Sequence, residues 1–427
     1  MESDQPVKEG KTQKYVHRDL EKEIDRYLAA KEIIAVVGPR QSGKTTLLRN
    51  IYSRLSDKRK AFLSFDDREA LDLFSSDIKS FAALYVEGNK QVFIDEFQYA
   101  REGGKTLKYL YDNYDAKIFI SGSSATELSI HSIKYLVGRI FVYTLYPFSF
   151  DEFLRHRDER LFALYKGAPH SGEITKRINR FFEEYVIYGG YPRVVLSEDA
   201  AEKETILKNI YNTYLLKEVR EILGYREDYK LTKLVSALAL QTGNTISYEE
   251  LSNVTGYGYK ELLSALNILE KTYIAFPVRP YYTNKRTELS KAPKVYFIDN
   301  GLRNCALKDY RERQLRSDAG AMSENFVASE LLKENAQLGF WRTKSGAEVD
   351  FVATIKGKTI PIEVKSKESG ASIGRSGHSF IEKYKPKDFI LASLSAERTA
   401  KEKDTTIRFL PIWAVKNYAA SLSVGEK

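Results

Sequence analysis

The segment GPRQSGKT, residues 38–45, constrains the fold of this chain more than any other stretch. It fits the pattern G-x-x-x-x-G-K-[ST], and it lies between the apolar run IIAVV and the amphipathic run TTLLRNIYSRL. Gly38 and Gly43 let the backbone bend so that successive N–H groups face one anion, and the start of the next helix adds partial positive charge. The sequence therefore predicts a strand, a phosphate-binding loop and a helix, in this order.

The residues of this loop have separate expected tasks. Lys44 would reach the β- and γ-phosphates of a nucleotide, and the hydroxyl of Thr45 would face Mg²⁺. The loop as a whole would surround the phosphates, and its members are Gly38, Pro39, Arg40, Gln41, Ser42, Gly43, Lys44, Thr45 and Thr46. The motif and its context predict ATP and Mg²⁺ as the ligands of this loop.

A second apolar run, VFIDE, ends in Asp95 and Glu96. A nucleotide-hydrolysing site needs one acid near the Mg²⁺ ion and a neighbour that orients or polarises the attacking water. Two acids at a strand end are usually a solvated terminus, but their position after a phosphate loop favours catalysis. The next strand enters SGSSA, where Ser123 or Ser124 could bond the γ-phosphate or the water; an ordinary turn is the alternative.

Short apolar runs alternate with longer amphipathic runs from about residue 31 to residue 147, which predicts an α/β sheet that is mostly parallel and covered on both faces. Five runs are typical of strands: EIIAVVG, AFLSFDD, QVFIDEF, KIFISG and FVYTLYP. Because 427 residues exceed one ordinary core, we expect several domains. The predicted boundaries are 1–160 for a P-loop domain, 161–243 for a helical lid or linker, 244–310 for a winged helix and 311–427 for a last α/β domain.

Residues 246–299 have the pattern of a winged helix. Ser247 and Glu250 predict a capping box for a short helix, two glycines make the turn, and a second amphipathic helix precedes the strand runs IAFPVRPYY and PKVYFID. In DNA-binding proteins of this kind the second helix enters the major groove. The accessible face of that helix offers few groups for base recognition, so a structural or protein-contact role is the alternative. These groups are Tyr257, Tyr259 and Lys260.

The stretch GAEVDFVATIKGKTIPIEVKSK brings acids and a lysine to the ends of two apolar runs. Asp350 and Glu363 end these runs, and Lys365 follows on the same face of the strand as Glu363. Converging carboxylates at strand ends suit Mg²⁺ or Mn²⁺, and a lysine beside them would stabilise charge on a phosphate. The alternative is an ordinary ion pair between Glu363 and Lys365, with Asp350 at a turn.

Charge and cysteine content add weaker constraints. The net charge of +9 favours polyanionic partners such as DNA, although 58 acidic residues are interspersed among 67 basic ones, and a well-solvated basic surface is the alternative. The single cysteine, Cys305, excludes an intramolecular disulfide and favours a reducing cytosol, and no apolar run approaches the ~18 residues of a membrane span. Basic residues that would suit a phosphate backbone are Lys356, Lys358, Lys367, Arg375, Lys383, Lys385 and Lys387.

Several motifs together resemble a known family. The segments GPRQSGKTTL, VFIDEFQ, FISGSSA, LVGRIF and LYPFSFDEF are followed in order by GGYPRVV, KVYFIDNGLRN, SENFVASEL and WRTKSGAEVDFV. The chain resembles, over nearly its whole length, the AAA+ ATPases of archaea and bacteria that carry a winged helix and a C-terminal domain of unknown function. This resemblance implies an ATPase site made of Lys44, Thr45, Asp95 and Glu96, with Ser123 or Ser124 as a sensor.

The resemblance also implies an arginine supplied by a neighbouring subunit. Arg139 in LVGRIF is the candidate for this finger, which predicts a homo-oligomer; an intrachain salt bridge is the alternative interpretation of Arg139. Arg193, after GGYP, is a candidate for a second sensor.

The C-terminal part resembles the core of PD-(D/E)xK nucleases. Glu324, Asp350, Glu363 and Lys365 match its acidic and basic positions, with Val349 where the proline would be. The implied fold is an α/β chain with a P-loop AAA+ domain, a helical extension, a winged helix and a restriction-endonuclease-like domain, and Mg²⁺ or Mn²⁺ would bind Glu324, Asp350 and Glu363.

The resulting hypothesis is an ATP-hydrolysing AAA+ protein that acts on DNA and has a metal-dependent nuclease domain. One alternative is a nucleotide-switched protein-interaction module whose nuclease-like domain is a catalytically inert scaffold. A weaker alternative is a small-molecule kinase, against which the long extension after Asp95 and Glu96 argues.

Overall fold

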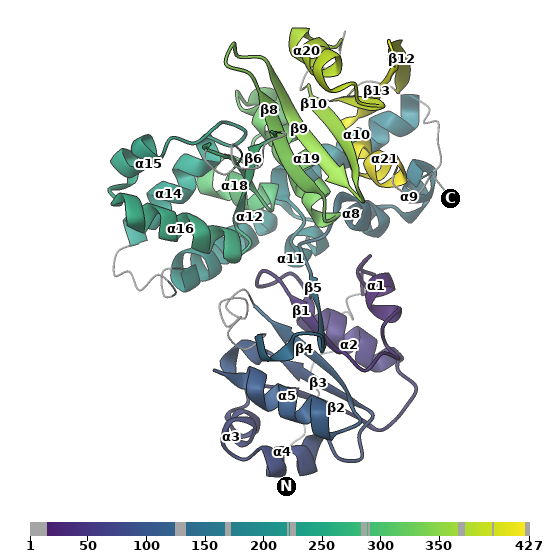
Figure 1. Cartoon of the computed structure of the whole chain (residues 1–427), viewed down its shortest axis with the longest axis vertical. Coiled ribbons are helices and arrows are strands. Elements are labelled where there is room, and N and C mark those ends of the chain that lie inside the picture. Colours follow the sequence, from purple (N-terminus) through teal and green to yellow (C-terminus); the bar gives the residue numbers. More distant parts are fainter. Residues whose placement is uncertain are drawn as a thin grey trace.

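The computed structural model describes residues 15–123, 134–166, 172–219, 222, 228–282, 288, 291–365, 372–394 and 397–422. The first part of the chain forms the lower lobe in Figure 1, and the remainder forms an upper body with helices on the left and a large sheet on the right. The chain passes from the lower lobe to the upper body between strand β5 and helix α8 (Figure 1).

The lower lobe is built on a five-stranded parallel sheet in the order β2-β3-β4-β1-β5. Its strands are β1 (Ile33–Val37), β2 (Lys60–Ser64), β3 (Gln91–Asp95), β4 (Lys117–Gly122) and β5 (Ile140–Thr144). All five predicted strand runs are confirmed. Each run is short and apolar because both faces of the sheet are covered, so every position along a strand such as β1 is buried.

Helices cover the two faces of this sheet. Two of them, α1 (Glu21–Asp25) and α2 (Lys44–Arg54), share one apolar cluster with β1 and β3, through residues such as Leu47 and Phe93. On the opposite face, α3 (Arg68–Ser76), α4 (Ile78–Tyr85) and α5 (Gly103–Asn113) bury Phe74, Phe81 and Leu107. Short 3₁₀ turns lie at η1 (Phe97–Tyr99) and η2 (Lys134–Leu136).

A helical region follows. Ser149 caps α8, because its hydroxyl accepts from the Glu152 N–H while the Glu152 carboxylate accepts from the Ser149 N–H. The GGYP segment interrupts the helices as predicted, since α10 ends at Tyr188 and α11 begins at Pro192. The elements are α8 (Phe150–Arg157), α9 (Glu159–Lys166), α10 (Gly172–Tyr188), α11 (Pro192–Leu196), α12 (Ala200–Ile210), the π-helix η3 (Tyr211–Glu218) and α14 (Asp228–Leu240).

The segment expected to be a winged helix contains α15 (Tyr248–Thr255), α16 (Tyr259–Lys271), β6 (Ala275–Pro280), β7 (Lys294–Phe297) and α18 (Asn300–Leu307). The Ser247 hydroxyl caps α15 by accepting from the Glu250 N–H, but the Glu250 carboxylate accepts from the Gln241 amide instead of completing a capping box. The two strands expected as a wing extend a larger sheet, because β6 pairs with β8 in parallel.

That larger sheet has eight strands in the order β12-β13-β11-β10-β9-β8-β6-β7 and mixes parallel with antiparallel pairs. The remaining strands are β8 (Gln337–Arg342), β9 (Glu348–Ile355), β10 (Lys358–Val364), β11 (Asp388–Ser393), β12 (Arg398–Glu402) and β13 (Thr405–Pro411). The helices and turns beside them are η4 (Arg313–Leu315), α19 (Ala319–Lys333), α20 (Arg375–Tyr384), η5 (Ile412–Ala414) and α21 (Val415–Leu422).

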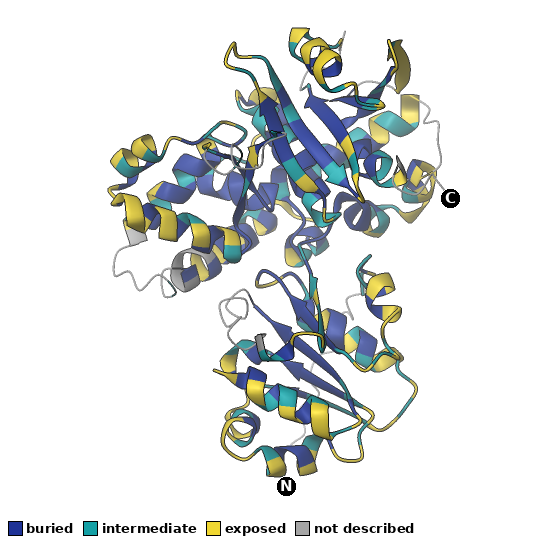
Figure 2. Ribbon diagram, in the orientation of Figure 1, coloured by how far each residue is buried: buried dark blue, intermediate teal, exposed yellow. Residues whose placement is uncertain are grey.

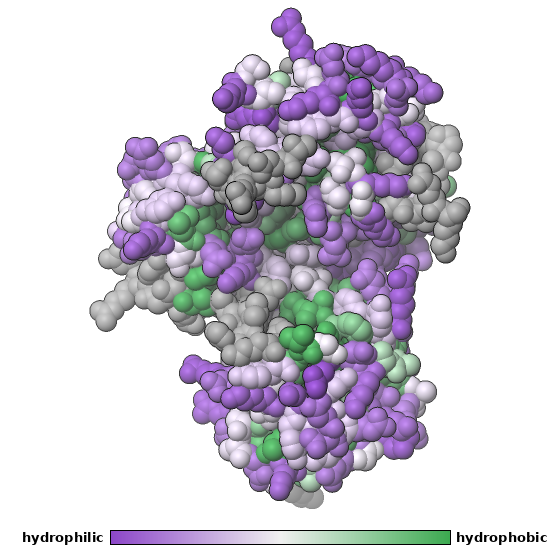
Figure 3. All heavy atoms as spheres, in the orientation of Figure 1, coloured by the Kyte–Doolittle hydropathy of each residue, from purple (hydrophilic) through white to green (hydrophobic). Residues whose placement is uncertain are grey.

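Burial follows this layered arrangement. The strands of both sheets are mostly buried in Figure 2, whereas the outer faces of α5 and α16 are exposed. On the face shown in Figure 3, hydrophilic residues cover both ends of the molecule, and hydrophobic side chains gather on the helices at left and near the junction of the two parts. Cys305 is buried, as expected of a core residue. Among the described residues, none of the helices is both long and apolar enough to traverse a bilayer.

Candidate functional site

The phosphate loop connects β1 to α2 with the backbone that the motif predicts. Gly38 and Gly43 have φ of 146° and 97°, and a side chain at Gly38 would overlap the carbonyl of Leu145. The Lys44 ammonium is buried and donates to the carbonyl oxygens of Gly38 and Pro39, at 3.1 and 2.8 Å. The lysine therefore folds back over its own loop, where these two carbonyl oxygens hold its charge.

Both acids of VFIDE lie at the end of β3, which is separated from β1 and its loop by the single strand β4. Asp95 is buried, and one of its carboxylate oxygens accepts a hydrogen bond from the hydroxyl of Ser121 on β4. Glu96 adopts a left-handed conformation with φ of 55°, which is uncommon for this residue type and frequent at functional sites. Its carboxylate accepts from the Gln98 amide, and the Gln98 carbonyl oxygen accepts from the N–H of Ser123 at 3.1 Å.

A cavity of about 620 Å³ opens above the loop, which is large enough for a nucleotide-sized ligand. Loop residues from Arg40 to Thr46 and Glu96 line its polar side. Apolar surface comes from Tyr15, Val16, Phe148, Pro192 and Leu196. The remaining lining residues are Arg18, Asp66, Tyr99 and Arg193. The cavity thus combines a cationic phosphate loop with an apolar wall supplied by the N-terminal segment and α11.

Of the two serines predicted as sensors, the structure describes Ser123 but not Ser124. Ser123 follows β4, is buried, and its hydroxyl has no hydrogen-bond partner among the described residues. Such an unsatisfied buried hydroxyl is costly unless a ligand or water meets it. Ser124 lies outside the described residues.

Arg139 forms the intrachain ion pair that was the alternative to a finger. Its guanidinium contacts the carboxylate of Asp112 at 3.0 Å and lies over the ring of Tyr111. It is not among the residues that line the cavity of its own chain. Arg193 does line that cavity, from the first turn of α11.

The four C-terminal candidates come from α19, β9 and the end of β10. Glu363 is buried and forms an ion pair with Lys365. Asp350 accepts from the N–H of Val364 at 2.7 Å, and Glu324 accepts from the hydroxyl of Tyr296 at 3.3 Å. The sequence pattern therefore brings these residues to one region of the second sheet.

Electrostatic interactions raise the pKa values of two of these acids. The pKa of Glu324 rises to about 8, because burial disfavours its charged form and the Asp350 carboxylate repels it. The pKa of Asp350 rises to about 6, mainly through burial, although the Lys294 ammonium opposes the shift. Lys294 is itself buried and pairs with Glu348. No local pattern indicates this role for Lys294, which comes from β7 and is separated along the chain from both acids.

The prediction of a three-carboxylate metal site is not supported by this arrangement. No group of three His, Cys, Asp or Glu side chains within the described ranges is placed to hold a metal ion. Lys365 neutralises Glu363, while the backbone of Val364 and the hydroxyl of Tyr296 already bond Asp350 and Glu324. As positioned here, these residues do not fit a Mg²⁺ or Mn²⁺ ion, and we derive no reaction through one.

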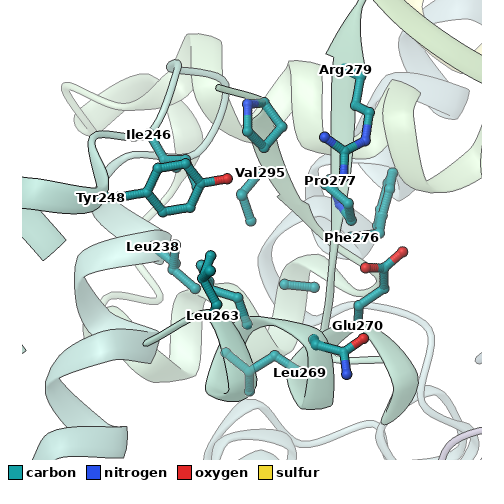
Figure 4. Close-up of a pocket in the computed structure, with 14 residues that line it drawn as sticks. Leu238, Ile246, Tyr248, Leu263, Leu269, Glu270, Phe276, Pro277, Arg279 and Val295 are labelled. Atoms are coloured by element: carbon teal, nitrogen blue, oxygen red, sulfur yellow. The ribbon is translucent and has the colours of Figure 1, made fainter. Parts of the chain in front are cut away.

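A second cavity, of about 200 Å³, lies between α14, α16 and β6. In Figure 4, Glu270 and Arg279 stand on one side of it and Leu238, Ile246 and Leu263 on the other. Partial burial raises the pKa of Glu270. Both charged side chains lie on the exposed rim, so this cavity is a surface groove in which no reactive groups converge.

Two residues at the nucleotide cavity had no assigned role from the sequence. Gln98 bridges Glu96 and Ser123, and its place in VFIDEFQ was the available signal. Arg18 is buried and donates to the carbonyl oxygen of Ser42 within the phosphate loop at 2.9 Å. No local pattern around Arg18 indicates this contact.

The loop, the acidic strand end and the parallel sheet define a P-loop ATPase-like domain, which is joined to a second domain with a mixed sheet. Comparison with protein families agrees for the first domain: residues 30–154 match the family described as AAA domain, which supports an AAA+ ATPase assignment. Residues 179–313 and 319–415 match families described as Domain of unknown function (DUF8612) and Domain of unknown function (DUF4143).

Similar whole chains occur in distant organisms. An uncharacterized protein of Haemophilus influenzae is 25% identical over 352 residues, which is 78% of this chain and 82% of that protein. An uncharacterized protein of Methanocaldococcus jannaschii is 26% identical over 354 residues, which is 80% of this chain and 76% of that protein. Relatives that align with most of this chain therefore occur in both a bacterium and an archaeon.

Among solved structures, the Walker-type ATPase of Pyrococcus abyssi has a TM-score of 0.46 and 17% sequence identity, covering 69% of this chain and 96% of its own. The Orc1 protein of Aeropyrum pernix in complex with DNA has a TM-score of 0.30 and 13% identity, covering 73% of this chain and 94% of its own.

Proposed function

We propose that this protein binds and hydrolyses ATP at the phosphate loop. The observation that carries the proposal is the geometry of Lys44, whose buried ammonium lies within its glycine-rich loop beside a cavity of about 620 Å³ that Glu96 also lines. The backbone amides of the loop and the N-terminus of α2 would hold the β- and γ-phosphates. Lys44 would exchange its carbonyl partners for phosphate oxygens, which are stronger acceptors because they are charged.

The remaining groups supply positioning and water activation. Thr45 and Asp95 have the oxygen donors that Mg²⁺ takes from proteins when phosphates complete its shell, so these two residues would hold it. Bound there, Mg²⁺ neutralises charge on the phosphates. Glu96, oriented by Gln98, would accept the proton of the attacking water. The hydroxyl of Ser123, which has no partner within the described part of the chain, would bond that water or the γ-phosphate.

The test compares ATP hydrolysis by the wild type and by Lys44→Ala, with Lys79→Ala as the matched control. Lys79 is an exposed lysine on α4, away from the cavity. We expect Lys44→Ala to lose at least about 100-fold in kcat/KM, because a transition-state charge contact of this kind contributes about 3 kcal/mol. Equal rates for Lys44→Ala and the wild type would refute the proposal.

We further propose that the ATPase acts on DNA. The support is the basic balance of the chain and the set of lysines and arginines after β9, of which Lys356, Lys358, Arg375, Lys383, Lys385 and Lys387 lie in the described ranges. We also propose that residues 244–310 act as a winged helix. In addition, Arg139 would complete the ATP site of a neighbouring subunit in a homo-oligomer. The single buried cysteine supports a reducing cytosol as the compartment.

The DNA proposal is tested by hydrolysis and binding together. We expect duplex DNA to stimulate ATP hydrolysis, and we expect the affinity of the protein for DNA to fall steeply as salt rises.

A cleavage assay tests the nuclease hypothesis. Labelled single-stranded, duplex and branched DNA is incubated with the wild type and with Glu363→Ala, in the presence of Mg²⁺ or Mn²⁺ and with or without ATP. Cleavage by the wild type alone would establish a nuclease; DNA-independent hydrolysis without binding would favour the nucleotide-switched protein-interaction module instead.

A further inference from the structure

Arg18 lies before α1 and is 6% exposed, although arginine is seldom buried without a specific reason. Its guanidinium donates in three directions: to the Ser42 carbonyl at 2.9 Å, to the Tyr146 carbonyl at 2.7 Å and to the Glu152 carboxylate at 3.0 Å. It also lies 4.7 Å from the ring centre of Phe148, which lines the nucleotide cavity. One side chain therefore joins the phosphate loop to the segment that leads out of the first domain.

The contact with Ser42 acts on the phosphate loop itself. The carbonyl of Ser42 and the N–H of Gly43 belong to one planar trans peptide group, so they point in opposite directions. When Arg18 holds the carbonyl oxygen, it also fixes the direction of the Gly43 N–H. A phosphate that accepts from this N–H would polarise the peptide and strengthen the bond to Arg18.

The contact with Glu152 leads into the second domain. The Glu152 carboxylate also accepts from the N–H groups of Asp19 and Ser149, at 2.8 and 2.9 Å, so it fixes the start of α8. The next amide of that helix, the N–H of Phe150, donates to Glu330 on α19 at 3.0 Å. Glu330 is buried, and the same helix carries Glu324.

A second line of contacts starts at Phe148. Its N–H donates to the Gly190 carbonyl at 2.7 Å, and its own carbonyl accepts from the Tyr185 hydroxyl at 2.6 Å. The N–H of Gly190 donates to Asp299 at 2.7 Å, and a side chain at Gly190 would overlap the Phe148 carbonyl. The motifs LYPFSFDEF, GGYPRVV and KVYFIDNG thus meet at one close-packed junction, directly beside Arg18.

We infer that Arg18 is a positioning residue that couples nucleotide binding at the phosphate loop to the arrangement of α8 and α19 in the second domain. This inference rests on the proposed ATPase function. A buried pair between Arg18 and Glu152 that served folding alone would leave the response of the second domain to nucleotide unchanged in a folded variant. The two interpretations therefore differ in a measurable quantity.

The chain provides its own reporter of this response. It has two tryptophans, Trp341 and Trp413, and both lie in the second domain. The hydroxyl of Tyr165 lies 2.9 Å from a carboxylate oxygen of Asp151 on α8 and 3.1 Å from the carbonyl oxygen of Trp413. In full-length protein with Trp341→Phe, fluorescence therefore reports Trp413, which contacts α8 through Tyr165.

The experiment titrates this protein with Mg²⁺ and a non-hydrolysable ATP analogue, and follows Trp413 fluorescence and hydrogen exchange in α19. A fluorescent ATP analogue measures affinity independently. We expect nucleotide to change both signals in the parent protein. In Arg18→Gln the affinity should fall by no more than about 10-fold, while both changes are lost at saturation. Glu152→Gln should have the same effect, and the double variant should be no worse than either single variant.

Two further variants keep the test decisive. Arg155→Gln removes a neighbouring arginine that pairs with Asp19 at the surface, and it should retain both signals. Arg18→Lys keeps the charge, but its donors all lie on one nitrogen, whereas Arg18 reaches Glu152, Ser42 and Tyr146 from three separate nitrogens of its planar guanidinium. This variant should therefore remain folded and lose most of the change. An undiminished change in Arg18→Gln or Arg18→Lys at saturation would overturn the inference, as would nucleotide binding by the parent without either signal. Absence of nucleotide binding by the parent would instead refute the proposed function, and the inference with it.

Discussion

At the phosphate loop the charged side chains contact backbone carbonyls, a hydroxyl and an amide, whereas in the second domain two acids face one another beside the ammonium of Lys294. Lys44 and Asp95 each have neutral partners that a ligand can replace or supplement. Glu324 and Asp350 repel each other, and Lys294 reduces that repulsion. The first arrangement suits a ligand that arrives with charge; the second makes domain stability depend on pH.

This contrast makes Lys294→Met the substitution with the largest expected effect on the free energy of unfolding. Removing one partner from a buried charged cluster typically costs 3–5 kcal/mol, so we expect a loss of about 3 kcal/mol at pH 8. At pH 5 the cost should be smaller, because Glu324 and Asp350 take up protons and no longer need the ammonium. Urea unfolding followed by tryptophan fluorescence measures this, since both tryptophans lie in the second domain.

The control for that substitution is Lys387→Met, which changes an exposed lysine of the same domain. It should alter the free energy of unfolding by less than about 0.5 kcal/mol at either pH. Equal losses for the two variants would mean that the charge of Lys294 does not stabilise the acids. ATP hydrolysis by the Lys294 variant, measured below the unfolding transition, should remain near that of the wild type.

At the phosphate loop, Glu96→Gln should change chemistry and leave stability almost untouched. Glutamine keeps the size and can still contact Gln98, but it cannot accept the proton of the attacking water. We expect kcat to fall about 100-fold or more, equivalent to about 3 kcal/mol of barrier, with nucleotide affinity unchanged. Single-turnover hydrolysis and binding of a fluorescent ATP analogue separate the two quantities. A parallel loss of affinity and rate would assign Glu96 to binding instead.

The raised pKa of Glu324 predicts how stability depends on pH. The folded form binds its proton more tightly than the unfolded chain, so the stabilisation is complete below about pH 4.5 and is lost as pH rises through about 8. Glu324→Gln is neutral at every pH and keeps an acceptor for the Tyr296 hydroxyl. At pH 8.5 this variant should exceed the wild type by about 2 kcal/mol in free energy of unfolding of the second domain.

The comparison that checks this uses urea transitions at pH 5 and pH 8.5. The difference between variant and wild type should nearly vanish at pH 5. A wild-type transition whose midpoint is the same at both pH values would show that the repulsion between Glu324 and Asp350 has no effect on folding.

The sequence predicted the five strands and the phosphate loop because their signals are local. Alternation of apolar runs and the spacing of glycines depend on neighbours a few residues apart. Arg18 could not be interpreted in this way, because its partners Ser42 and Glu152 lie 24 and 134 residues further along. The prediction of a C-terminal metal site included Lys365 and its possible ion pair with Glu363, but it did not include Lys294, for a similar reason. Only the fold shows which charges neutralise one another.

Arg139→Ala carries the smallest expected effect on stability and distinguishes the two interpretations of that residue. Its ion pair with Asp112 is about one-third exposed on both sides, and such pairs contribute less than about 1 kcal/mol. If Arg139 only forms this ion pair, ATP hydrolysis by the variant should match that of the wild type. If Arg139 completes a neighbouring subunit's site, as we predicted, hydrolysis should fall by about 10³-fold or more.

A mixing experiment then identifies where Arg139 acts. The Lys44→Ala protein keeps Arg139 but has no functional loop, and the Arg139→Ala protein has the reverse defect. Mixed oligomers should regain hydrolysis, because the Lys44 variant supplies its arginine to an intact loop in the other subunit. A loss of hydrolysis in Arg139→Ala without recovery on mixing would locate its effect within its own chain, through Asp112 and Tyr111, and would remove the reason to expect an oligomeric active site.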